Sequence, residues 1–418
     1  MTSSENNRPL SVIMIAASLP PLPAGGAETQ ALRLGEALTA KGVTVRFITP
    51  GKGSISGETA IRGMSVHRLN SLANRLFGRL AGWKKKQVQA SATRIEYDDA
   101  TETTNRINSR VGWPTIIYYN IFFYHSLFFL WRRRHSFDIL HAHTMEWSAI
   151  VAARLSKALG KPVLIKDSTM NGFASLTRFP NGARLQQQIG QQAQFVAMTR
   201  VIGENMEKAG IPPGKINTIP NGLSIPTNPP LREPASPPRV LFVGNLYQQP
   251  AKGIDVLLKA WVQVSREHPT AILDIVGDGD LPTYEEYTAG LGIAGSVRFH
   301  GKRSDLPDFY QKAAVFVLPS RREGMSNALM EAMAQALPCV ATDISGSQDL
   351  IRSGENGLIV PPASVVELAK ALGYMLAHPV EAEEMGQKAW AGAAKQIGME
   401  VIAQRYWDLY RRLVTASR

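Results

Sequence analysis

Two series of short apolar runs, separated by one proline-rich tract, constrain this 418-residue chain more than any other feature. Each run has the length of a β-strand, as in residues 11–18 (SVIMIAAS) and 239–244 (RVLFVG), and a longer amphipathic stretch follows it. Continuous apolar strands that alternate with helices are typical of a parallel sheet covered by helices on both faces. The sequence therefore predicts an α/β protein.

The proline-rich tract, residues 219–240 (IPNGLSIPTNPPLREPASPPRV), indicates a linker, because proline lacks an amide proton and blocks helices. We expect a first α/β domain over residues 1–222, a linker over 223–238 and a second α/β domain over 239–395. Residues 396–418 have apolar positions at helical spacing, and we expect a terminal helix there that crosses back to the first domain.

Composition limits the partners and the compartment. The formal net charge of +12 favours an anionic partner: a polyanion, an anionic membrane surface or an anionic small substrate. No motif of the common nucleic-acid-binding modules is present, so we expect no nucleic acid. The single cysteine, Cys339, lies in an apolar run, which predicts a buried inert thiol and is consistent with a reducing compartment.

The stretch 320–351 carries two carboxylates in different settings. Glu323 lies in a glycine-containing turn, and Glu331 lies in the helix that follows, which Ser326 is expected to cap and Pro338 to end. The free amides of a helix start can bind phosphate oxygens. Since the neighbours of Glu331 are apolar, its carboxylate needs hydroxyl or cationic partners. The alternative is a carboxylate satisfied by local backbone amides.

Three more residues follow apolar runs, where open α/β sheets bind ligands. Lys252 follows the strand at 239–244 and could neutralise a diphosphate, although a lone lysine is more often a solvated charge. Gly25 and Gly26 follow the first strand and would allow a ligand to approach the backbone. They do not form the dinucleotide fingerprint, and an ordinary strand-to-helix turn is the alternative.

His141 and His143 alternate at the end of a predicted strand, so their side chains are expected on one face. A histidine pair can bind metal, but no third and fourth ligands follow at recognisable spacing. We therefore expect no metal site, with one structural and one functional histidine.

In this order, the motifs resemble those of the family 4 retaining glycosyltransferases of the GT-B architecture (glycosyl transferases group 1). The resemblance is carried by GGAE, DILHAH, KINTIPNG, LDIVGDG, EGMSNALMEAMAQALPCVAT and SGENGLIVPP, and it covers most of the chain. It implies two Rossmann-like domains that face each other across a cleft, the first binding the acceptor and the second a nucleotide sugar. It also implies sugar transfer with retention, without a metal or any cofactor besides the donor.

The resemblance further implies residue roles. Glu323 would contact donor sugar hydroxyls, Glu331 the ribose, and Lys252 the leaving diphosphate. His143 would lie near the reacting centre, with His141 as the alternative. The implied catalytic residues are His143, Glu323 and Lys252, and the implied donor-binding residues are Gly25, Gly26, Gly244, Asn245, Ser326, Asn327, Ala328, Leu329 and Glu331.

Two positions depart from the family pattern. Asn245 stands where the family usually has arginine, so one phosphate-neutralising charge is missing, for which Lys302, Arg303 or Arg321 are candidate substitutes. Asp349 stands where the family usually has glutamate.

Residues 114–131 (PTIIYYNIFFYHSLFFLW), which three arginines follow, approach the length of a membrane span. A spanning helix would leave the first domain incomplete, so we expect either a helix packed on its sheet or an interfacial helix. The latter, over residues 114–134, would dock on an anionic cytoplasmic leaflet. Residues 72–112 lack both periodicities and predict a surface excursion, either substrate-handling or merely solvated.

The resemblance and these features together predict a metal-independent retaining glycosyltransferase that is cytoplasmic, either free or peripheral on the inner membrane leaflet. Its acceptor would be a saccharide or a lipid-linked saccharide of surface polysaccharide or glycolipid assembly. One alternative is a synthase of a soluble glycoside or sugar phosphate. Another is a non-catalytic sugar-nucleotide-binding subunit of a glycan assembly complex.

Overall fold

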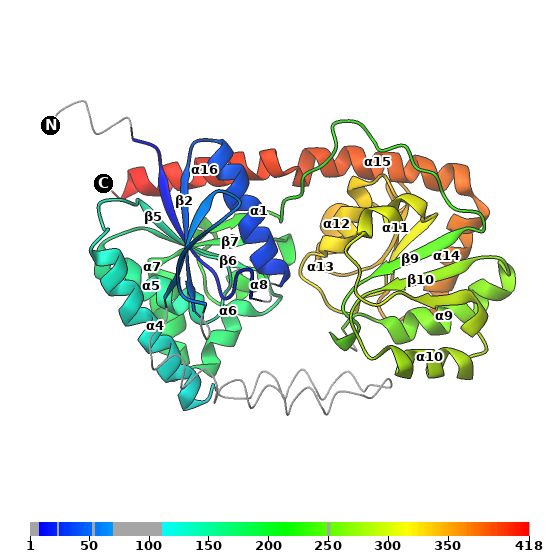
Figure 1. Cartoon of the computed structure of the whole chain (residues 1–418), viewed down its shortest axis with the longest axis horizontal. Helices are drawn as coiled ribbons and strands as arrows, with labels where there is room; N and C mark the ends of the chain where they lie inside the picture. The colour runs from blue at the N-terminus through cyan, green and yellow to red at the C-terminus, as the bar shows by residue number, and fades with distance from the viewer. Residues whose placement is uncertain (1–7, 23–24, 52–54, 70–110, 249–250, 418) are drawn as a thin grey trace. The chain divides into compact units, whose positions relative to one another are not determined.

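The structure, a computed structural model, describes all residues except 1–7, 23–24, 52–54, 70–110, 249–250 and 418. The described chain forms two units (Figure 1). Unit 1 contains the chain up to Gly222 together with Met399–Arg418, and unit 2 contains Leu223–Gly398. Both are α/β, so the predicted fold class is confirmed. The surface excursion predicted at 72–112 lies almost wholly outside the described residues.

Unit 1 is built on an eight-stranded sheet with the order β3-β4-β2-β1-β5-β6-β7-β8. Its strands are β1 (Ser11–Ile15), β2 (Thr44–Pro50), β3 (Gly57–Ile61), β4 (Met64–Leu69), β5 (Ile139–Ala142), β6 (Val163–Asp167), β7 (Gln194–Ala197) and β8 (Ile216–Thr218). All neighbours run parallel except β3 and β4, which form an antiparallel hairpin at the edge. The apolar-run pattern missed β3 because most of its residues are exposed.

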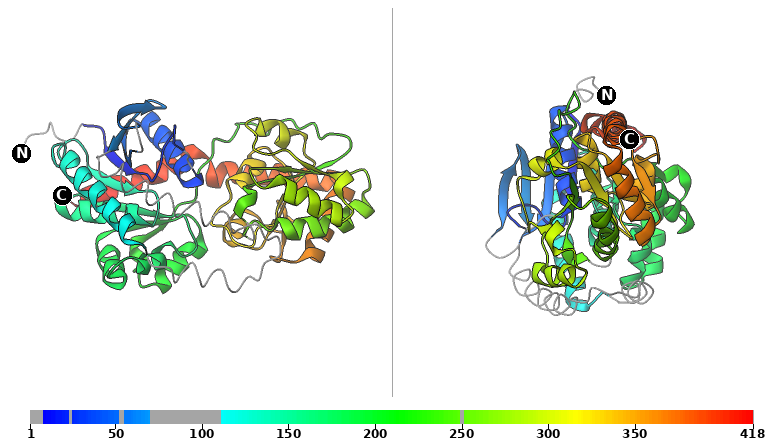
Figure 2. Two further views of the ribbon diagram at one scale, coloured as in Figure 1. Left: turned by 60° about the horizontal axis from the view of Figure 1, so that its bottom comes forward. Right: turned by 90° about the vertical axis from the view of Figure 1, so that its right-hand side faces the viewer.

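Helices flank both faces of this sheet (Figures 1 and 2). They are α1 (Gly26–Ala40), α4 (Trp113–Trp131), α5 (Trp147–Leu159), α6 (Gly172–Ser175), α7 (Gly182–Gln192), α8 (Arg200–Lys208) and α16 (Met399–Ala416), with short 3-10 turns at Leu176–Arg178 and Pro213–Lys215. Over the ranges that the structure describes, no helix combines the length and the apolar character needed to cross a membrane.

The last helix of the chain, α16, completes the core of unit 1. Ile402, Tyr406, Leu409 and Tyr410 from α16 are buried with the apolar residues of β1, β2 and α1. Because α16 directly follows unit 2 in the sequence, the chain passes from one unit to the other twice.

Unit 2 is built on a six-stranded, wholly parallel sheet with the order β11-β10-β9-β12-β13-β14. The strands are β9 (Arg239–Val243), β10 (Ile272–Val276), β11 (Val297–Phe299), β12 (Val315–Leu318), β13 (Cys339–Thr342) and β14 (Leu358–Val360). The helices are α9 (Ile254–Glu267), α10 (Leu281–Gly290), α11 (Leu306–Lys312), α12 (Asn327–Ala334), α13 (Ser345–Leu350), α14 (Val365–Ala377) and α15 (Pro379–Ile397), with 3-10 turns at Leu246–Gln248 and Ala294–Ser296.

The proline-rich tract is tied to unit 2 by Arg232. Its guanidinium group donates hydrogen bonds to the carbonyl oxygens of Ala313 and Ala336 and pairs with Glu383 at 2.9 Å. With only 2% of its side chain exposed, Arg232 fastens an otherwise irregular segment. The thiol of Cys339 is buried, as predicted, and burial raises its pKa.

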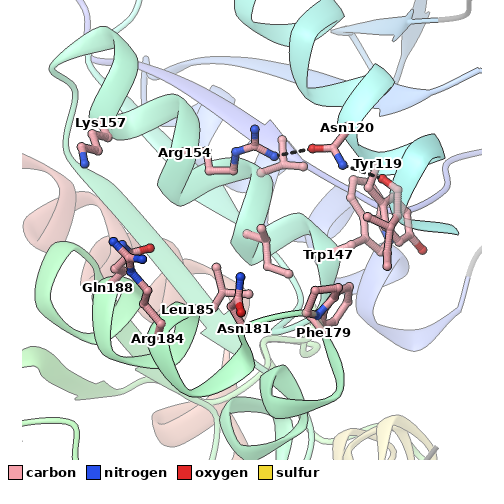
Figure 3. A pocket seen from close by; sticks show the side chains of 14 residues that line it. Tyr119, Asn120, Trp147, Arg154, Lys157, Phe179, Asn181, Arg184, Leu185 and Gln188 are labelled. Carbon is pink, nitrogen blue, oxygen red and sulfur yellow. Dashed lines mark hydrogen bonds between the residues drawn. The ribbon is translucent and has the colours of Figure 1, made fainter. Parts of the chain in front are cut away.

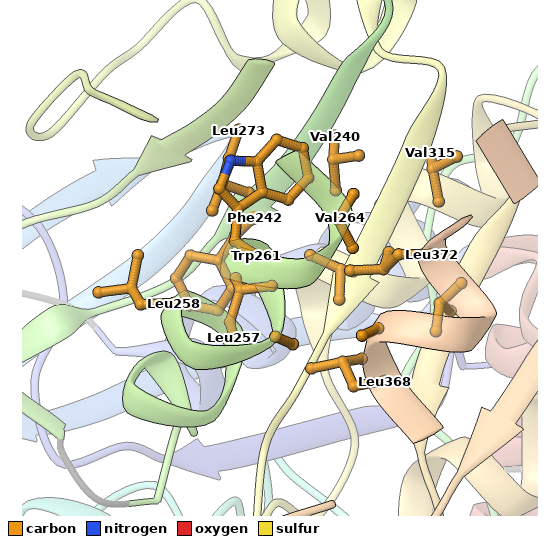
Figure 4. Close-up of a cluster of buried hydrophobic side chains, with 14 of the residues drawn as sticks. Val240, Phe242, Leu257, Leu258, Trp261, Val264, Leu273, Val315, Leu368 and Leu372 are labelled. Carbon is orange, nitrogen blue, oxygen red and sulfur yellow. The ribbon is translucent and has the colours of Figure 1, made fainter. Parts of the chain in front are cut away.

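Trp261 is the largest fully buried side chain of unit 2 (Figure 4). It extends from α9 into a cluster with Phe242, Leu273 and Leu372, and its indole Nε1 donates to Ser296 Oγ at 3.0 Å.

In both sheets the first strand of the unit is central and has later strands on each side. These strands are β1, between β2 and β5, and β9, between β10 and β12. Ligand sites of open α/β sheets lie at the carboxyl ends of such strands.

We predict that Trp261→Ala lowers the free energy of unfolding of unit 2 by about 4 kcal/mol, because it leaves a large cavity in the core. Urea unfolding followed by circular dichroism measures the change. The control Val366→Ala, at a position on α14 that is 55% exposed, should change stability by less than about 1 kcal/mol. Equal effects of the two substitutions would contradict this account of the core.

Candidate active site

Lys252 and Glu323 form an ion pair where β9 and β12 end in unit 2. Lys252 Nζ lies 2.7 Å from Glu323 Oε1, and Ser320 Oγ donates to Glu323 Oε2 at 3.1 Å. Lys252 keeps 15% and Glu323 18% of the side-chain surface exposed. Both predicted catalytic groups of this unit are thus held against each other and remain accessible.

A glycine makes the approach of these two loops possible. Gly253 has a φ of +65°, and a Cβ atom there would lie 2.0 Å from the carbonyl oxygen of Pro319. The amide of Arg321 donates to the carbonyl oxygen of Ala251 at 2.8 Å, which joins the loops on the other side of Lys252. Only glycine therefore lets the start of α9 lie against the turn that carries Glu323.

The amino end of α12 follows the same turn. Ser326 Oγ accepts a hydrogen bond from the Leu329 amide at 3.3 Å, so the predicted helix cap is confirmed. Tyr310 OH donates to Glu331 Oε2 at 3.2 Å, and thus supplies the hydroxyl partner that the apolar surroundings of Glu331 predicted. In an α-helix the first amides, here those of Asn327 and Ala328, point out of the amino end.

At the carboxyl end of β9, backbone groups contact one another directly. Gly244 donates its amide hydrogen to the carbonyl oxygen of Val276 at 3.0 Å. A Cβ atom on Gly277 would lie 1.7 Å from the carbonyl oxygen of Gly244, so the ends of β9 and β10 can meet only without a side chain there.

The residue that departs from the family pattern, Asn245, is exposed and caps its own turn, since its Oδ1 accepts from the Tyr247 amide at 2.9 Å. Two of its candidate substitutes already hold carboxylates. Arg321 makes two hydrogen bonds to Asp255, at 2.7 and 2.6 Å, and Arg303 makes two to Asp305, at 2.9 and 2.7 Å.

The third candidate, Lys302, is exposed and has no ion-pair partner within the described parts of the chain. Asp349, the other departure, lies in the short helix α13 and is half-buried. The roles of Lys302 and Asp349 stay predictions.

In unit 1 the two predicted histidines lie together at the end of β5. Their ring centroids are 4.0 Å apart, and His141 Nδ1 lies 2.6 Å from the hydroxyl oxygen of Tyr410 on α16. His143 is 2% exposed, yet neither of its ring nitrogens has a hydrogen-bond partner among the described residues. His141 is therefore the histidine held by a hydrogen bond to another side chain, whereas the ring nitrogens of His143 make none to the described residues.

Burial and a nearby ammonium group keep His143 neutral. Burial first, and then the charge of Lys166, lower the pKa of His143 to about 3. Burial lowers the pKa of Lys166 itself to about 8, and its Nζ donates to Asn221 Oδ1 at 2.6 Å. A neutral imidazole can give or accept a hydrogen bond at pH 7, but with this pKa it is a weak base.

The sequence did not single out Lys166 and Asn221. The available signals were a lysine inside the apolar run at 163–167 and an asparagine in the KINTIPNG motif, but 55 residues separate the two. Their contact depends on the sheet bringing β6 near the loop after β8, which no local pattern specifies.

At the start of α1, the backbone groups of the glycine turn form hydrogen bonds with side chains of the same helix. The Gly25 amide donates to Glu28 Oε2 at 3.0 Å, and Thr29 Oγ1 donates to the Gly25 carbonyl oxygen at 3.0 Å. Gly26 is the first helical residue. A phosphate bound by these amides would have to displace the carboxylate of Glu28.

The predicted site residues thus fall into two groups. Lys252, Glu323 and the α12 segment belong to unit 2, whereas Gly25, Gly26 and His143 belong to unit 1. Within the described ranges, no three His, Cys, Asp or Glu side chains are grouped so that they could hold a metal ion. A separate pocket of about 480 Å³ lies between α4, α5 and α7 of unit 1 and includes none of the predicted residues.

Comparison with known families assigns both halves of the chain. Residues 24–225 match the family described as Glycosyltransferase Family 4, and residues 237–378 match the family described as Glycosyl transferases group 1. The two matches meet at the proline-rich tract.

The chain is similar to curated glycosyltransferases. It is 26% identical to the phosphatidyl-myo-inositol mannosyltransferase of Mycobacterium leprae over 94% of each chain. It is 26% identical to the D-inositol 3-phosphate glycosyltransferase of Frankia alni over 67% of this chain and 75% of that protein. It is 29% identical to the lipopolysaccharide core biosynthesis glycosyltransferase LpsE of Rhizobium meliloti over 43% of this chain and 51% of that protein. This chain spans only about half of the length of LpsE, and about half or less of the length of two other curated relatives.

Solved structures share the fold. The sucrose-phosphate synthase of Thermosynechococcus elongatus superposes with a TM-score of 0.71 at 20% identity, covering 97% of this chain and all of that one. HepE of Anabaena in complex with UDP-glucose superposes with a TM-score of 0.68 at 18% identity and the same coverage. These likenesses show the GT-B fold and confirm the predicted architecture class.

We predict that lowering the pH from 7 to 5 costs unit 1 about 2 kcal/mol through His143, because its pKa is about 3 when folded and 6.5 when unfolded. The unfolded chain binds more protons over this window, so the free energy of unfolding falls as the pH falls. Urea unfolding at several pH values should give His143→Gln a shallower pH dependence. The control His135→Gln, at an exposed position of the same unit, should keep the wild-type slope. Identical slopes for all three proteins would contradict the prediction.

We predict that Tyr310→Phe lowers the free energy of unfolding of unit 2 by about 1 kcal/mol, since Glu331 and the Ala328 carbonyl group lose a donor while the buried ring stays. Chemical denaturation measures the loss. Tyr247→Phe, at a position that is 58% exposed, is the matched control and should be neutral. A Tyr310→Phe protein as stable as the control would show that this hydroxyl does not support Glu331.

Proposed function

We infer a function from the premise that the chain belongs to the glycosyltransferase family 4 and glycosyl transferases group 1 proteins, whose two domains it carries. The protein transfers a sugar from a nucleotide-sugar donor to an acceptor and retains the configuration at the anomeric carbon. It is a hexosyltransferase-type enzyme whose activity requires no metal ion.

The observation that carries this proposal is the loop-and-helix segment of unit 2. It combines an ammonium group, two carboxylates and a capped helix start, with Lys252 paired to Glu323 and Glu331 held by Tyr310. These groups match the parts of a nucleotide sugar in turn. A cation and helix amides suit a diphosphate, and carboxylates suit the hydroxyls of a sugar and a ribose.

Donor binding would exchange partners within this segment. The ammonium group of Lys252 turns from Glu323 to the diphosphate, and Glu323 accepts hydrogen bonds from the donor sugar instead. Glu331 receives the ribose hydroxyls, and the amides from Asn327 to Leu329 face the phosphate oxygens. Gly244 and Asn245 line the same ligand where β9 ends.

The bond between the anomeric carbon and the phosphate oxygen breaks while the acceptor oxygen bonds to the same face of that carbon. The acceptor proton passes to an oxygen of the leaving phosphate. Lys252 and the positive end of α12 stabilise the charge that develops on the leaving group. The protein therefore needs no separate nucleophile.

Unit 1 contributes acceptor binding and a contact to the donor. Gly25 and Gly26 approach the phosphates after Glu28 has moved away. The backbone carbonyl oxygen of His143 accepts a hydrogen bond from the donor sugar, because the low pKa of its buried imidazole makes that ring a poor general base. His141 holds the ring of His143 in place.

A uridine diphosphate sugar is the first donor to test, since HepE of Anabaena, which shares the fold, was solved with UDP-glucose. A lipid-linked acceptor is supported by the names of two relatives, which refer to phosphatidyl-myo-inositol and to lipopolysaccharide core. It is also supported by α4, where Trp113, Tyr124, Phe128 and Trp131 are 54% to 65% exposed. With the arginines at 132–134, these aromatic side chains suit an anionic membrane surface.

Two other functions have specific support. The similarity to the D-inositol 3-phosphate glycosyltransferase favours a soluble sugar phosphate or glycoside as product. The neutral Asn245, in place of a phosphate-binding arginine, favours a binding subunit without catalysis. Donor hydrolysis or transfer separates that last possibility from the enzyme.

We predict that one nucleotide among UDP, GDP and ADP, free or as a sugar conjugate, raises the melting temperature of the protein by about 5 °C at 100 times its Kd. Glu331→Ala should abolish this shift, because the ribose loses its acceptor. Glu384→Ala, at an exposed position of unit 2, is the control and should keep it. Thermal-shift screening measures all three proteins.

A shift with donor turnover supports the enzyme, and a shift without turnover supports the binding subunit. The absence of any shift contradicts both, and a shift that survives in Glu331→Ala contradicts the ribose role.

A further inference from the structure

We propose that the pocket between α4, α5 and α7 of unit 1 binds a lipid phosphate, taking the phosphate group and the hydrocarbon next to it. This assignment rests on the proposed function, because it gives the lipid-linked acceptor of that reaction a binding site. The pocket has a volume of about 480 Å³, within the range of small-molecule sites.

The pocket has two chemically different ends. Figure 3 shows Tyr119, Trp147 and Phe179 gathered at one end and Lys157, Arg184 and Gln188 at the other. Aliphatic side chains complete the lining, among them Ile116, Ile150, Val151 and Leu185. A ligand that satisfies both ends must carry an apolar part and a negatively charged part.

The apolar end of the pocket is made of aromatic rings that pack on one another. The rings of Tyr119 and Trp147 stack at 4.7 Å with an interplanar angle of 10°, and Phe122 meets Trp147 edge-on at 5.3 Å. Arg154 fastens α5 to α4, since its guanidinium group donates to Asn120 Oδ1 at 2.7 Å and lies 3.9 Å from the ring centroid of Phe123. The aromatic groups therefore form a fixed wall against which hydrocarbon can pack.

The other end has positive charge without an internal counterion. None of the 14 lining residues is acidic, and the exposed Lys157 and Arg184 have no ion-pair partner within the described ranges. Elsewhere on unit 1, the exposed Arg62 does have one, since it pairs with Glu36 at 2.9 Å. The pocket also reaches the amino end of α7, where Asn181 makes no side-chain cap. That helix end adds to the attraction for an anion.

The helix that forms one wall of the pocket indicates that the bound phosphate group belongs to a lipid. Ile116, Tyr119 and Asn120 of α4 line the pocket, and further along the same helix Tyr124, Phe128 and Trp131 are more than half exposed. Arginines 132–134 follow, with the guanidinium group of Arg133 4.0 Å from the ring centroid of Phe129. Aromatic and basic side chains of this kind reside at the headgroup level of a bilayer, where a lipid phosphate is found. Free phosphate would use only the cationic end.

Flotation of the full chain with vesicles tests the assignment. The vesicles are phosphatidylcholine with a minor fraction of undecaprenyl phosphate, of undecaprenol, or of phosphatidylglycerol at matched charge. Binding should be strongest with undecaprenyl phosphate. Lys157→Gln/Arg184→Gln should weaken that binding on the order of tenfold, because each basic residue near an anionic lipid contributes appreciably. The charge-matched control Lys388→Gln/Lys395→Gln, at exposed positions of unit 2, should keep it.

A second variant separates the pocket from the surface charge. Leu185→Trp fills the pocket without changing charge, and since Leu185 is only half-buried the helix should tolerate the substitution. It should lose the preference for undecaprenyl phosphate and retain wild-type binding to phosphatidylglycerol.

Three results would overturn the assignment: equal binding to undecaprenol, full competition by soluble inorganic phosphate, or wild-type behaviour of both pocket variants. Nucleotide-induced stabilisation, measured on the same protein, distinguishes this failure from failure of the proposed function. If nucleotide stabilises the protein but undecaprenyl phosphate does not increase vesicle binding, the proposed function stands and the pocket assignment is wrong. The opposite pattern keeps the pocket and refutes the function.

Discussion

In each unit of this chain, helices cover both faces of a sheet whose strands are almost all parallel, so polar side chains gather where the strands end. His143 follows β5, and Lys166 and Asp167 close β6. In unit 2, Gly244 follows β9, and Ser320 lies two residues after β12. The chemistry of the chain is therefore confined to these edges and the helix starts next to them, and the loops there must come close to one another.

The protein fills several of these positions with its own groups. Glu323 holds Lys252, Glu28 accepts from the amide of Gly25, and Asp255 holds Arg321. Each arrangement satisfies a cation or an amide with a carboxylate, the same pairing that a phosphate would offer. Exchange of one anion for another keeps each cation or amide paired, so no buried charge or donor is left without a partner. Internal pairing thus keeps the loops ordered without closing them to a ligand.

Local sequence signals anticipated most strands and the segment around α12. The apolar runs gave the buried strands, Ser326 was recognisable as a helix cap, and the apolar neighbours of Glu331 required a hydroxyl such as that of Tyr310. The features that the sequence did not predict depend on contacts between residues that are distant in sequence. The hairpin strand β3 is exposed and lacks an apolar pattern, and Lys166 meets Asn221 only through the order of strands. The pocket between α4, α5 and α7 draws its lining from three helices, so no single stretch of sequence describes it.

The dependence of the site on distant segments is clearest at His141. Its Nδ1 lies 2.6 Å from the hydroxyl oxygen of Tyr410, which comes 269 residues later on α16, and its ring lies 4.0 Å from that of His143. Burial of both rings lowers their pKa values, and Tyr406 and Tyr410 help to cover the ring of His141. The chain enters α16 only after completing unit 2, so the surroundings of a unit 1 histidine are finished by the last residues of the sequence. A terminal helix that the sequence indicated only as a packing element is therefore part of what keeps His141 neutral.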